Sequence, residues 1–266
     1  AITTGVVRNR TLIALMYWLE KTLYRSADLI AVLTPGFKRE ISSRFPDCAN
    51  KIFVFTNAAD FNLMQPTPED SPSRATLRKE LGWENQFVFA YFGAHGIAND
   101  LSQIIETAER LRSNQHVHFV CIGDGMQKPA LVKEAQRREL SNLEFLDPVA
   151  KSRVGDFIGA ADVCLAILKK SDTFKSVYPN KVFDYMCCAK PILTNIDGDI
   201  REIIESVGCG KYFDPEPAST ESENSFAAQA LHFYQMTSEQ RAQLGQSGRK
   251  FVVENFDRKK IADQYY

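Results

Sequence analysis

The sequence has no long hydrophobic run, no strong charge bias and no internal repeat. Without about 20 consecutive apolar residues no transmembrane helix is expected, and we expect no secretory signal peptide. The 266 residues carry a formal net charge of −1, so no basic surplus points to nucleic acid as a partner. The length and the 44% hydrophobic content suit one large or two modest globular domains.

Histidines and paired cysteines are also scarce. The four histidines have no ligand-like spacing with the six cysteines, and no C-x-x-C pair occurs, so a zinc site is not expected. Several cysteines lie in apolar runs, which favours reduced, buried thiols in a cytoplasmic protein. We predict neither a metal nor a cofactor. The absence of G-x-G-x-x-G after the first strand of the regular α/β region disfavours a dinucleotide enzyme.

From residue 74 onward, short apolar runs alternate with helical patterns. Strands are expected at residues 87–92, 117–122, 143–146, 163–168 and 191–195. Helices are expected at residues 74–81, 100–113, 129–138, 152–160, 200–207, 225–235 and 238–255. Strands that are apolar throughout and alternate with helices indicate a parallel sheet covered on both faces. The predicted fold class is α/β, a Rossmann-like doubly wound parallel sheet with a partial second α/β domain.

Residues 1–64 form a separate region in this prediction. An apolar stripe in residues 11–24 predicts a helix buried against a domain, although Trp18 and Lys21 also suit a helix at a membrane surface. Two strands, at 28–33 and 51–56, flank a helix that starts at Thr34 and Pro35. The Pro-rich segment 65–73 is the expected domain boundary, before a main domain at 74–250.

Residues 174–193, FKSVYPNKVFDYMCCAKPIL, hold the clearest candidate site. Pro179 suits the first turn of a short helix. A cation in that turn opposes the helix dipole, so Lys181 makes sense if an anion binds there. Lys175 adds a second charge, and Asp184 can accept hydrogen bonds from hydroxyl groups, which together suggest a nucleotide. The alternative, which the spacing alone favours, is an ordinary ion pair between Lys181 and Asp184 on a solvated face.

The same stretch resembles the motif of group 1 (family 4) retaining glycosyltransferases, whose two Rossmann-like domains face each other across a cleft (the GT-B type). That motif is a Glu, seven residues, a second Glu and a run like A-M-A-x-G-x-P-V. Here Ser176 stands at the first acidic position, Asp184 at the second, and Ala189 where Gly is usual. The form P-N/S-K-x-F-E-Y-M-A-x-G-K-P-I is similar to a subgroup that makes bacterial surface polysaccharides such as lipopolysaccharide and capsule.

Two earlier segments, A-D-L-I-A-V-L-T-P-G-F-K-R-E and K-I-F-V-F-T-N-A-A-D-F, resemble the end of the family's N-terminal domain. The resemblance implies that residues 1–64 are a remnant of an acceptor-side domain and that 74–250 form the donor-side domain. Residues 251–266 would form a helix crossing back to the N-terminal part. Such a fragment is expected to bind nucleotide but to turn over little substrate. The alternative is a lone domain with an extra β-α-β edge.

The resemblance also implies roles for single residues. Lys175 and Lys181 would stabilise the leaving diphosphate, and Asp184 would hold the ribose hydroxyls. The other donor-binding candidates are Gly93, His95, Gly96, Gly123, Asp147, Val149, Ser176, Tyr178, Pro179, Asn180 and Val182. A structural role suits His95 equally well, and Asp124, beside Gly123, suits a helix cap. The segment 197–199 mimics a metal-binding D-x-D motif but falls at an expected helix start.

The implied function is transfer of a sugar from a nucleotide sugar, first of all a UDP-linked one, to a saccharide or lipid-linked acceptor, with retention of configuration. The protein would be cytoplasmic, with peripheral contact to the inner face of the plasma membrane. Two alternatives stay open. One is a catalytically degenerate transferase-like subunit, and the other is a different sugar-nucleotide-binding Rossmann protein such as an epimerase.

Overall fold

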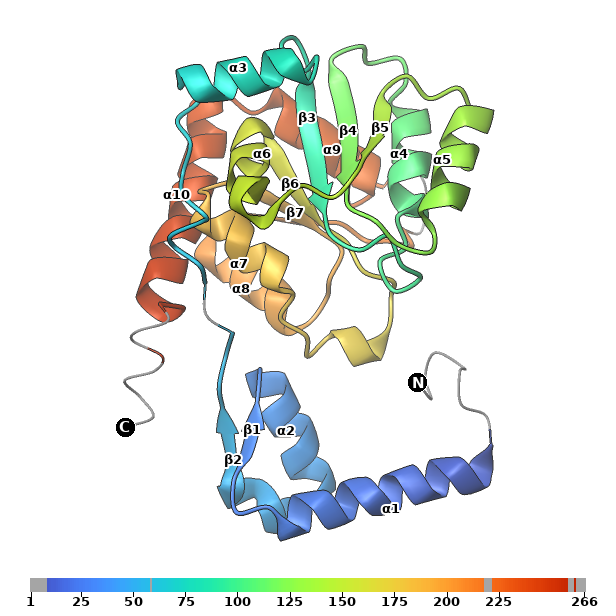
Figure 1. The fold of residues 1–266 in the computed structure, drawn as a ribbon, viewed down its shortest axis with the longest axis vertical. Coiled ribbons are helices and arrows are strands. Elements are labelled where there is room, and N and C mark those ends of the chain that lie inside the picture. The colour runs from blue at the N-terminus through green and yellow to red at the C-terminus, as the bar shows by residue number, and fades with distance from the viewer. Residues whose placement is uncertain (1–8, 58, 218–221, 258–260, 262–266) are drawn as a thin grey trace.

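The computed structural model describes residues 9–57, 59–217, 222–257 and 261. The described part forms a small unit at residues 10–57 and a large α/β unit from Ala59 onward (Figure 1). The large unit contains a six-stranded sheet in the order β5-β4-β3-β6-β7-β8, and each neighbouring pair is parallel. The strands are β3 (Phe87–Phe92), β4 (Val117–Ile122), β5 (Leu143–Leu146), β6 (Val163–Ala166), β7 (Ile192–Thr194) and β8 (Gly210–Tyr212).

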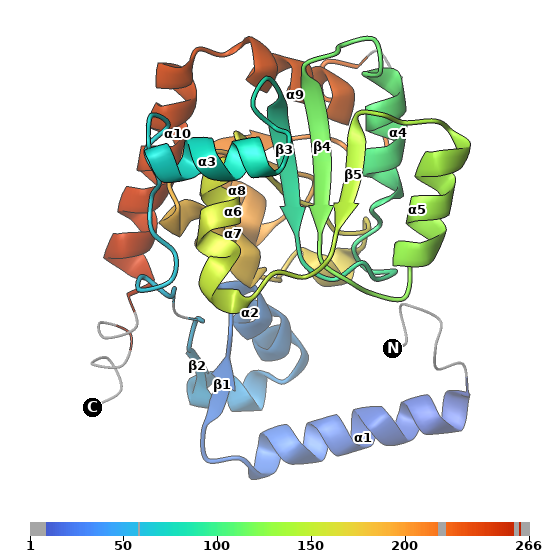
Figure 2. The same cartoon turned by 45° about the horizontal axis from the view of Figure 1, so that its top comes forward.

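Helices cover both faces of this sheet (Figures 1 and 2). One apolar core lies between the sheet and α3, α6, α7, α8 and α10, and a second lies between the opposite face and α4, α5 and α9. The α-helices are α3 (Pro72–Glu80), α4 (Ser102–Arg110), α5 (Lys128–Arg137), α6 (Val154–Ala160), α7 (Asn180–Cys187), α8 (Asp199–Val207), α9 (Phe226–Gln235) and α10 (Ser238–Asn255). Short 3-10 helices are η2 (Lys151–Arg153) and η3 (Asp172–Phe174). The predicted fold class is confirmed.

The strand predictions for β3, β4 and β5 agree with the structure at both ends, and β6 and β7 are shorter than expected. Strand β8 was missed. Its three residues are Gly, Lys and Tyr, so it has no apolar run to reveal it. Strand β8 lies beside β7 at the edge of the sheet, where fewer of its side chains need to be buried.

Strands β3 and β6 lie where the winding of the chain reverses. From β3 the chain continues to β4 and β5 on one side, and from β6 it continues to β7 and β8 on the other. In a doubly wound sheet, ligands bind in the crevice outside the carboxyl ends of the strands at this point. Helix α7 contacts β6, so the stretch singled out in the sequence lies beside this crevice.

The small unit consists of α1 (Arg10–Ser26), β1 (Ile30–Val32), α2 (Pro35–Arg44), η1 (Pro46–Lys51) and β2 (Ile52–Val54). Strands β1 and β2 form a parallel pair. Its core contains Ile30, Val32, Ile41, Cys48 and Ile52.

The expectation that residues 11–24 form a helix buried against a domain is wrong about the burial. Helix α1 forms, but none of its residues is buried, and Trp18 and Leu23 are 60% and 66% exposed. The helix contacts the rest of the small unit from its middle onward, where Tyr24 packs against Phe45 and Glu20 pairs with Arg44. The sheet of the small unit has two strands, and α1 extends past it (Figure 1). The sheet is therefore too small to cover the apolar stripe of the helix. Within the described residues, no helix is long and apolar enough to cross a membrane.

The two units meet at the N-terminus of α2. Thr34 caps this helix as predicted, and its hydroxyl also donates to the backbone carbonyl of Ser176, at 2.6 Å. The carboxylate of Asp199 accepts the N–H of Gly36 at 2.8 Å and pairs with Arg39. A Cβ on Gly36 would lie 2.5 Å from that carboxylate, so glycine is needed for this close approach.

The connection between the units lies against the large unit earlier than the predicted linker. Ala59 and Met64 both belong to the core of the large unit. The N–H of Ala59 donates to the carbonyl of Phe256, at 3.0 Å, just after α10. The chain beyond α10 therefore runs beside the connection. Residues 258–260 and 262–266 of the expected crossing helix lie outside the described residues.

Candidate functional site

A cavity of about 480 Å³ lies at the carboxyl ends of β3 and β4, beside α7. Its lining is mostly apolar, with one lysine and two aspartates. The lining residues are Phe92, Gly93, Ala94, Ile122, Gly123, Asp124, Pro148, Val149, Val154, Ile158, Lys181, Asp184 and Tyr185. Five predicted site residues are among them: Gly93, Gly123, Val149, Lys181 and Asp184. The position and the size suit a small organic ligand.

Helix α7 carries the two charged residues that were predicted from the motif. Pro179 is the residue just before the helix, one position earlier than expected, and Lys181 lies in the first turn. Val182 and Phe183 are buried in the core and hold the helix in place. After the helix, Ala189 adopts a left-handed backbone with φ of 52°, which explains why the family motif usually has Gly at this position.

The amine of Lys181 is buried beside the cavity. Its Nζ has no hydrogen-bond partner among the described residues and lies 3.9 Å from the centroid of the Tyr91 ring. Burial lowers the pKa of this amine from 10.5 to about 7. No ion pair with Asp184 occurs among the described residues, so the alternative of a solvated ion pair is wrong. A buried amine with no anion next to it is costly, which favours a role in binding an anionic group.

Asp184 is partly buried, and the pKa of its carboxyl group is raised to about 6. Burial is the main cause, and the carboxylate of Asp60 adds to it, whereas Lys151 opposes it. Asp60 also accepts the N–H of Leu63 and so holds the turn that follows β2. Nζ of Lys151 lies 3.8 Å from the carboxylate of Asp60. Asp60 and Lys151 come from distant parts of the sequence, so sequence analysis did not connect them with Asp184.

Tyr185 closes the crevice between β3 and β6. Its hydroxyl accepts the N–H of Phe92 and donates to the carbonyl of Leu165, both at 3.2 Å. The pairing of the two strands ends at Tyr91 and Leu165, so the hydroxyl bridges them where they separate. The sequence predicts no role for Tyr185, although an aromatic residue stands directly after the acidic position of the motif.

We expect Tyr185→Phe to lower the free energy of unfolding by about 1–3 kcal/mol, because the buried N–H of Phe92 loses its acceptor. Urea denaturation would measure the change. Tyr178→Phe is a matched control, since the Tyr178 ring packs on Phe183 and its hydroxyl makes no hydrogen bond to the described residues. Equal stability of the Tyr185 and Tyr178 variants would contradict the bridging role.

Two glycine loops form one wall of the cavity. Gly93 and Gly123 follow β3 and β4 and have φ values of 142° and 147°. A Cβ on Gly123 would lie 2.0 Å from the carbonyl oxygen of Gly93, so the loops can touch because residue 123 is glycine. Their backbone is therefore available to a ligand at close range.

His95 lies behind this wall and does not line the cavity. It is fully buried, and neither ring nitrogen has a partner among the described residues. Burial is the main cause that lowers its pKa to about 4, and Lys128 contributes, so the ring is neutral. Gly96 forms a turn with Asn99 outside the cavity.

The loops after β4 and β5 are held together by Lys128. Its Nζ donates to the carbonyls of Gly123 and Leu146, both at 2.9 Å, and to the carboxylate of Asp147 at 2.7 Å. The side chain of Asp147 is exposed, whereas Val149 two residues later lines the cavity. The suggested capping role of Asp124 is wrong, because its carboxylate accepts the N–H of Gly125 and α5 begins only at Lys128.

The other predicted site residues are not brought to this cavity. Lys175 pairs with Asp172 and lines a separate cavity of about 280 Å³ at the carboxyl ends of β6 and β7. Ser176 contacts the small unit through Thr34, and Asn180 accepts a hydrogen bond from Asn57. Tyr178 and Val182 lie in the apolar core beside α7.

The Asp-Gly-Asp segment does not gather ligands for a metal. Asp197 pairs with Arg201, and Asp199 bonds to Gly36 and Arg39 of the small unit. Across the part of the chain that the structure describes, no group of three or more His, Cys, Asp or Glu side chains is arranged to hold a metal ion.

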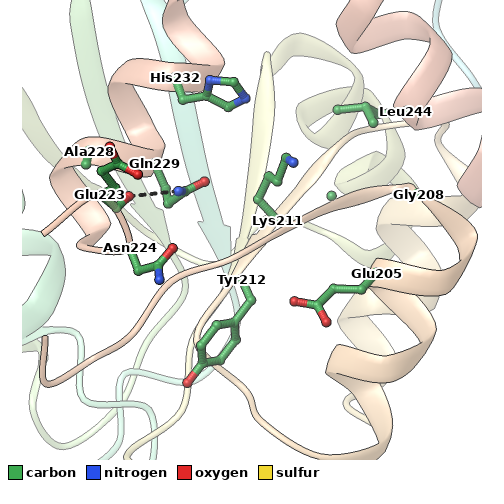
Figure 3. Close-up of a pocket in the computed structure, with 11 residues that line it drawn as sticks. Glu205, Gly208, Lys211, Tyr212, Glu223, Asn224, Ala228, Gln229, His232 and Leu244 are labelled. Atoms are coloured by element: carbon green, nitrogen blue, oxygen red, sulfur yellow. Dashed lines mark hydrogen bonds between the residues drawn. The ribbon is translucent and has the colours of Figure 1, made fainter.

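A larger cavity, of about 720 Å³, lies at the other edge of the sheet (Figure 3). Its walls come from α8, β8, the segment before α9, and α9 itself, with Glu205, Lys211, Glu223 and His232 around it. Charges of both signs line it, and it is remote from the glycine loops and from α7. We therefore take the cavity beside α7 as the candidate functional site.

Comparisons with known proteins agree with this fold. A model of the family described as glycosyl transferases group 1 matches residues 86–235. The protein WcaI of Escherichia coli (strain K12), named for colanic acid biosynthesis as a glycosyl transferase, is 29% identical over 135 residues, which are 50% of this chain and 32% of WcaI. Anabaena HepE, solved in complex with UDP, has a TM-score of 0.72 at 18% identity, over 91% of this chain and 63% of HepE.

A further similar structure is sucrose-phosphate synthase from Thermosynechococcus elongatus, with a TM-score of 0.76 at 15% identity, over 99% of this chain and 63% of that protein. The chain thus spans about a third of WcaI and less than two thirds of the two structures. The structural likenesses show a Rossmann-like fold of the GT-B type. Because the family model covers more than half of the sequence, the chain belongs to the group 1 glycosyl transferases.

Proposed function

We propose that the cavity beside α7 binds the nucleotide part of a nucleotide sugar, and that the protein transfers the sugar to a saccharide or lipid-linked acceptor in polysaccharide biosynthesis. The observation that carries this proposal is the pair of Lys181 and Asp184 one turn apart at the carboxyl edge of the sheet. The lysine amine has no anion beside it, and the carboxylate lies on the same rim. A diphosphate and a ribose supply the matching partners.

The contacts of the proposed complex follow from the chemistry of the lining. The diphosphate would lie against the backbone of Gly93 and Gly123 and receive a hydrogen bond from Lys181. The ribose hydroxyls would donate to Asp184, and the nucleobase would lie along the apolar wall near Val149. These positions use the groups that line the cavity. Stabilisation of the leaving diphosphate by preorganised donors is the catalytic contribution we assign to Lys181.

A UDP-linked donor is the first choice, because HepE was solved with UDP and with UDP-glucose. The retaining stereochemistry follows from the resemblance of the motif. Roles for Lys175, Ser176, Tyr178, Pro179, Asn180, His95, Gly96 and Asp147 in holding the donor stay predictions, as does contact with a membrane surface. Lys175 requires movement of its loop to reach the diphosphate, since it lies at a separate cavity.

A thermal-shift series with UDP, UDP-glucose, GDP and ADP tests the proposal. Ligand present at about 100 times its dissociation constant stabilises the folded state by about 2.7 kcal/mol, which is a rise of several degrees in Tm. We expect UDP and UDP-glucose to raise Tm more than GDP and ADP do. No rise with any nucleotide at millimolar concentration would overturn the proposal and favour a degenerate, non-binding subunit.

A further inference from the structure

The amine of Lys181 lies against the aromatic ring of Tyr91. The Nζ lies 3.9 Å from the ring centroid, over the face of the ring. A cation in this position is attracted by the negative face of an aromatic ring, and the attraction is stronger when water is excluded. Because Nζ is buried without a hydrogen-bond partner among the described residues, the ring is the group there that favours its charged form.

The ring itself is held rigidly. Tyr91 is fully buried near the end of β3, between Cys121 of β4 and Leu165 of β6 in the sheet register. Its hydroxyl donates to the carbonyl of Ala94 at 3.0 Å and so ties the ring to the loop that lines the cavity. A Cβ on Gly93 would lie 3.0 Å from Nζ of Lys181, so the glycine leaves room for the amine.

The ionisable groups around Lys181 do not supply a counter-charge. Cys121 of β4 is a neutral thiol, because burial raises its pKa well above the ordinary value. His95, in the loop after β3, is neutral because its pKa is lowered to about 4. Asp184 on α7 has a pKa raised to about 6, and within the described part of the chain it makes no hydrogen bond with the amine of Lys181. Lys128 of α5 is occupied by Asp147, and the carboxylate of Asp124 bonds to Gly125.

We propose that Tyr91 is a positioning residue for the nucleotide site: its ring holds the Lys181 amine at the cavity wall and favours the charged form that binds the diphosphate. This inference rests on the proposed function of the cavity. It predicts that the diphosphate meets an amine that is only partly protonated near neutral pH, so that binding above pH 7 takes up a proton from solvent. Loss of the ring lowers the pH at which the amine loses its charge.

The test compares UDP binding by the wild type, by Lys181→Met and by three further variants between pH 6 and pH 9, using calorimetry in two buffers of different ionisation enthalpy. Tyr91→Phe keeps the ring and loses the hydroxyl, whereas Tyr91→Leu loses the ring. Phe89→Leu is the matched control, since Phe89 lies two residues earlier on the same face of β3 and stacks on Phe119, away from Lys181.

We expect Tyr91→Leu to weaken UDP binding about fivefold at pH 8 and much less at pH 6, with the fall in affinity beginning at a lower pH. Tyr91→Phe and Phe89→Leu should keep the pH profile of the wild type. Proton uptake at pH 8 should be present in the wild type and absent in Lys181→Met. If Tyr91→Leu does not fold, Tyr91→Met replaces it, because methionine adapts to irregular space.

The possible results separate this inference from the proposed function. If Lys181→Met abolishes proton uptake but the leucine or methionine variant has the pH profile of the phenylalanine variant, the role of Tyr91 is overturned and the site stands. If the wild type does not bind UDP, or Lys181→Met binds it equally well, the proposed function fails and this inference fails with it.

Discussion

Lys181→Met should weaken UDP binding by about 10- to 100-fold, the range expected for loss of one charge-assisted hydrogen bond to a phosphate. Methionine has a similar length and no charge, so it fills the space of the lysine side chain without a donor. Calorimetric titration at pH 6.5 measures the change. At this pH the wild-type amine is mostly charged, because its pKa is about 7.

Lys190→Met is the matched control for this variant. Lys190 is also buried, and burial lowers the pKa of its amine, but it lies between α7 and β7 at a different cavity, near Arg74 and Asp162. We expect Lys190→Met to bind UDP like the wild type. Equal affinities of the wild type and Lys181→Met would remove Lys181 from the site.

Lys181→Met is also expected to stabilise the nucleotide-free protein. The pKa of Lys181 is about 7 in the folded state and 10.5 ordinarily, so the unfolded chain binds more protons between these values. The contribution of the Lys181 amine to the free energy of unfolding therefore rises with pH from about 7 to 10.5 in the wild type. The variant lacks this rise, and its advantage in Tm should be largest below pH 7 and decrease toward pH 10.

Asp184→Asn is expected to weaken UDP binding about tenfold, because an amide is a poorer acceptor for the ribose hydroxyls than a carboxylate. The variant should also lose discrimination between UDP and its 2′,3′-dideoxy analogue, whereas the wild type should prefer UDP. Titration of both proteins with both ligands isolates the interaction between residue and ribose. An equal preference for UDP in both proteins would place the ribose elsewhere.

The pH dependence of stability gives Asp184 a second test. Its folded-state pKa is about 6, above the ordinary 3.8, so between these values the folded state binds more protons than the unfolded chain. Stability therefore falls as pH rises through this window, and the penalty is complete above pH 6. Asp184→Asn should match the wild type in Tm near pH 4 and exceed it at pH 7. A difference that does not change with pH would show that the carboxyl group is not perturbed by burial.

Much of the candidate site can be predicted from the sequence because its parts follow local patterns. Lys181 and Asp184 lie three residues apart on one short helix, and Gly93 and Gly123 each follow a strand that is mostly apolar. Local patterns of this kind survive in the sequence because each depends on a few neighbouring residues. Lys175 shows the limit, since its loop carries it to another cavity although it lies only six residues before Lys181 in the chain.

The groups that tune the site were not predictable. Tyr91 is one of six apolar or aromatic residues of a buried strand, and nothing local distinguishes it from Phe89. Asp60 acts on Asp184 from the connection between the two units, and Tyr185 bridges two strands that are far apart in the chain. Helix α1 shows the converse, because its apolar stripe predicts burial and the structure provides no layer to bury it.

By itself, the sequence determined the parallel α/β class, the strands β3 to β5, the helix that carries Lys181 and Asp184, and the family motif. These features depend on periodicity and on residue order, which are written along the chain. Only the tertiary structure decided that the amine of Lys181 is buried over an aromatic ring, that Lys175 is apart from it, and that the cavity lies at the carboxyl ends of β3 and β4 beside α7. Burial and charge state depend on contacts between residues far apart in sequence, so they arise only when the sheet is assembled.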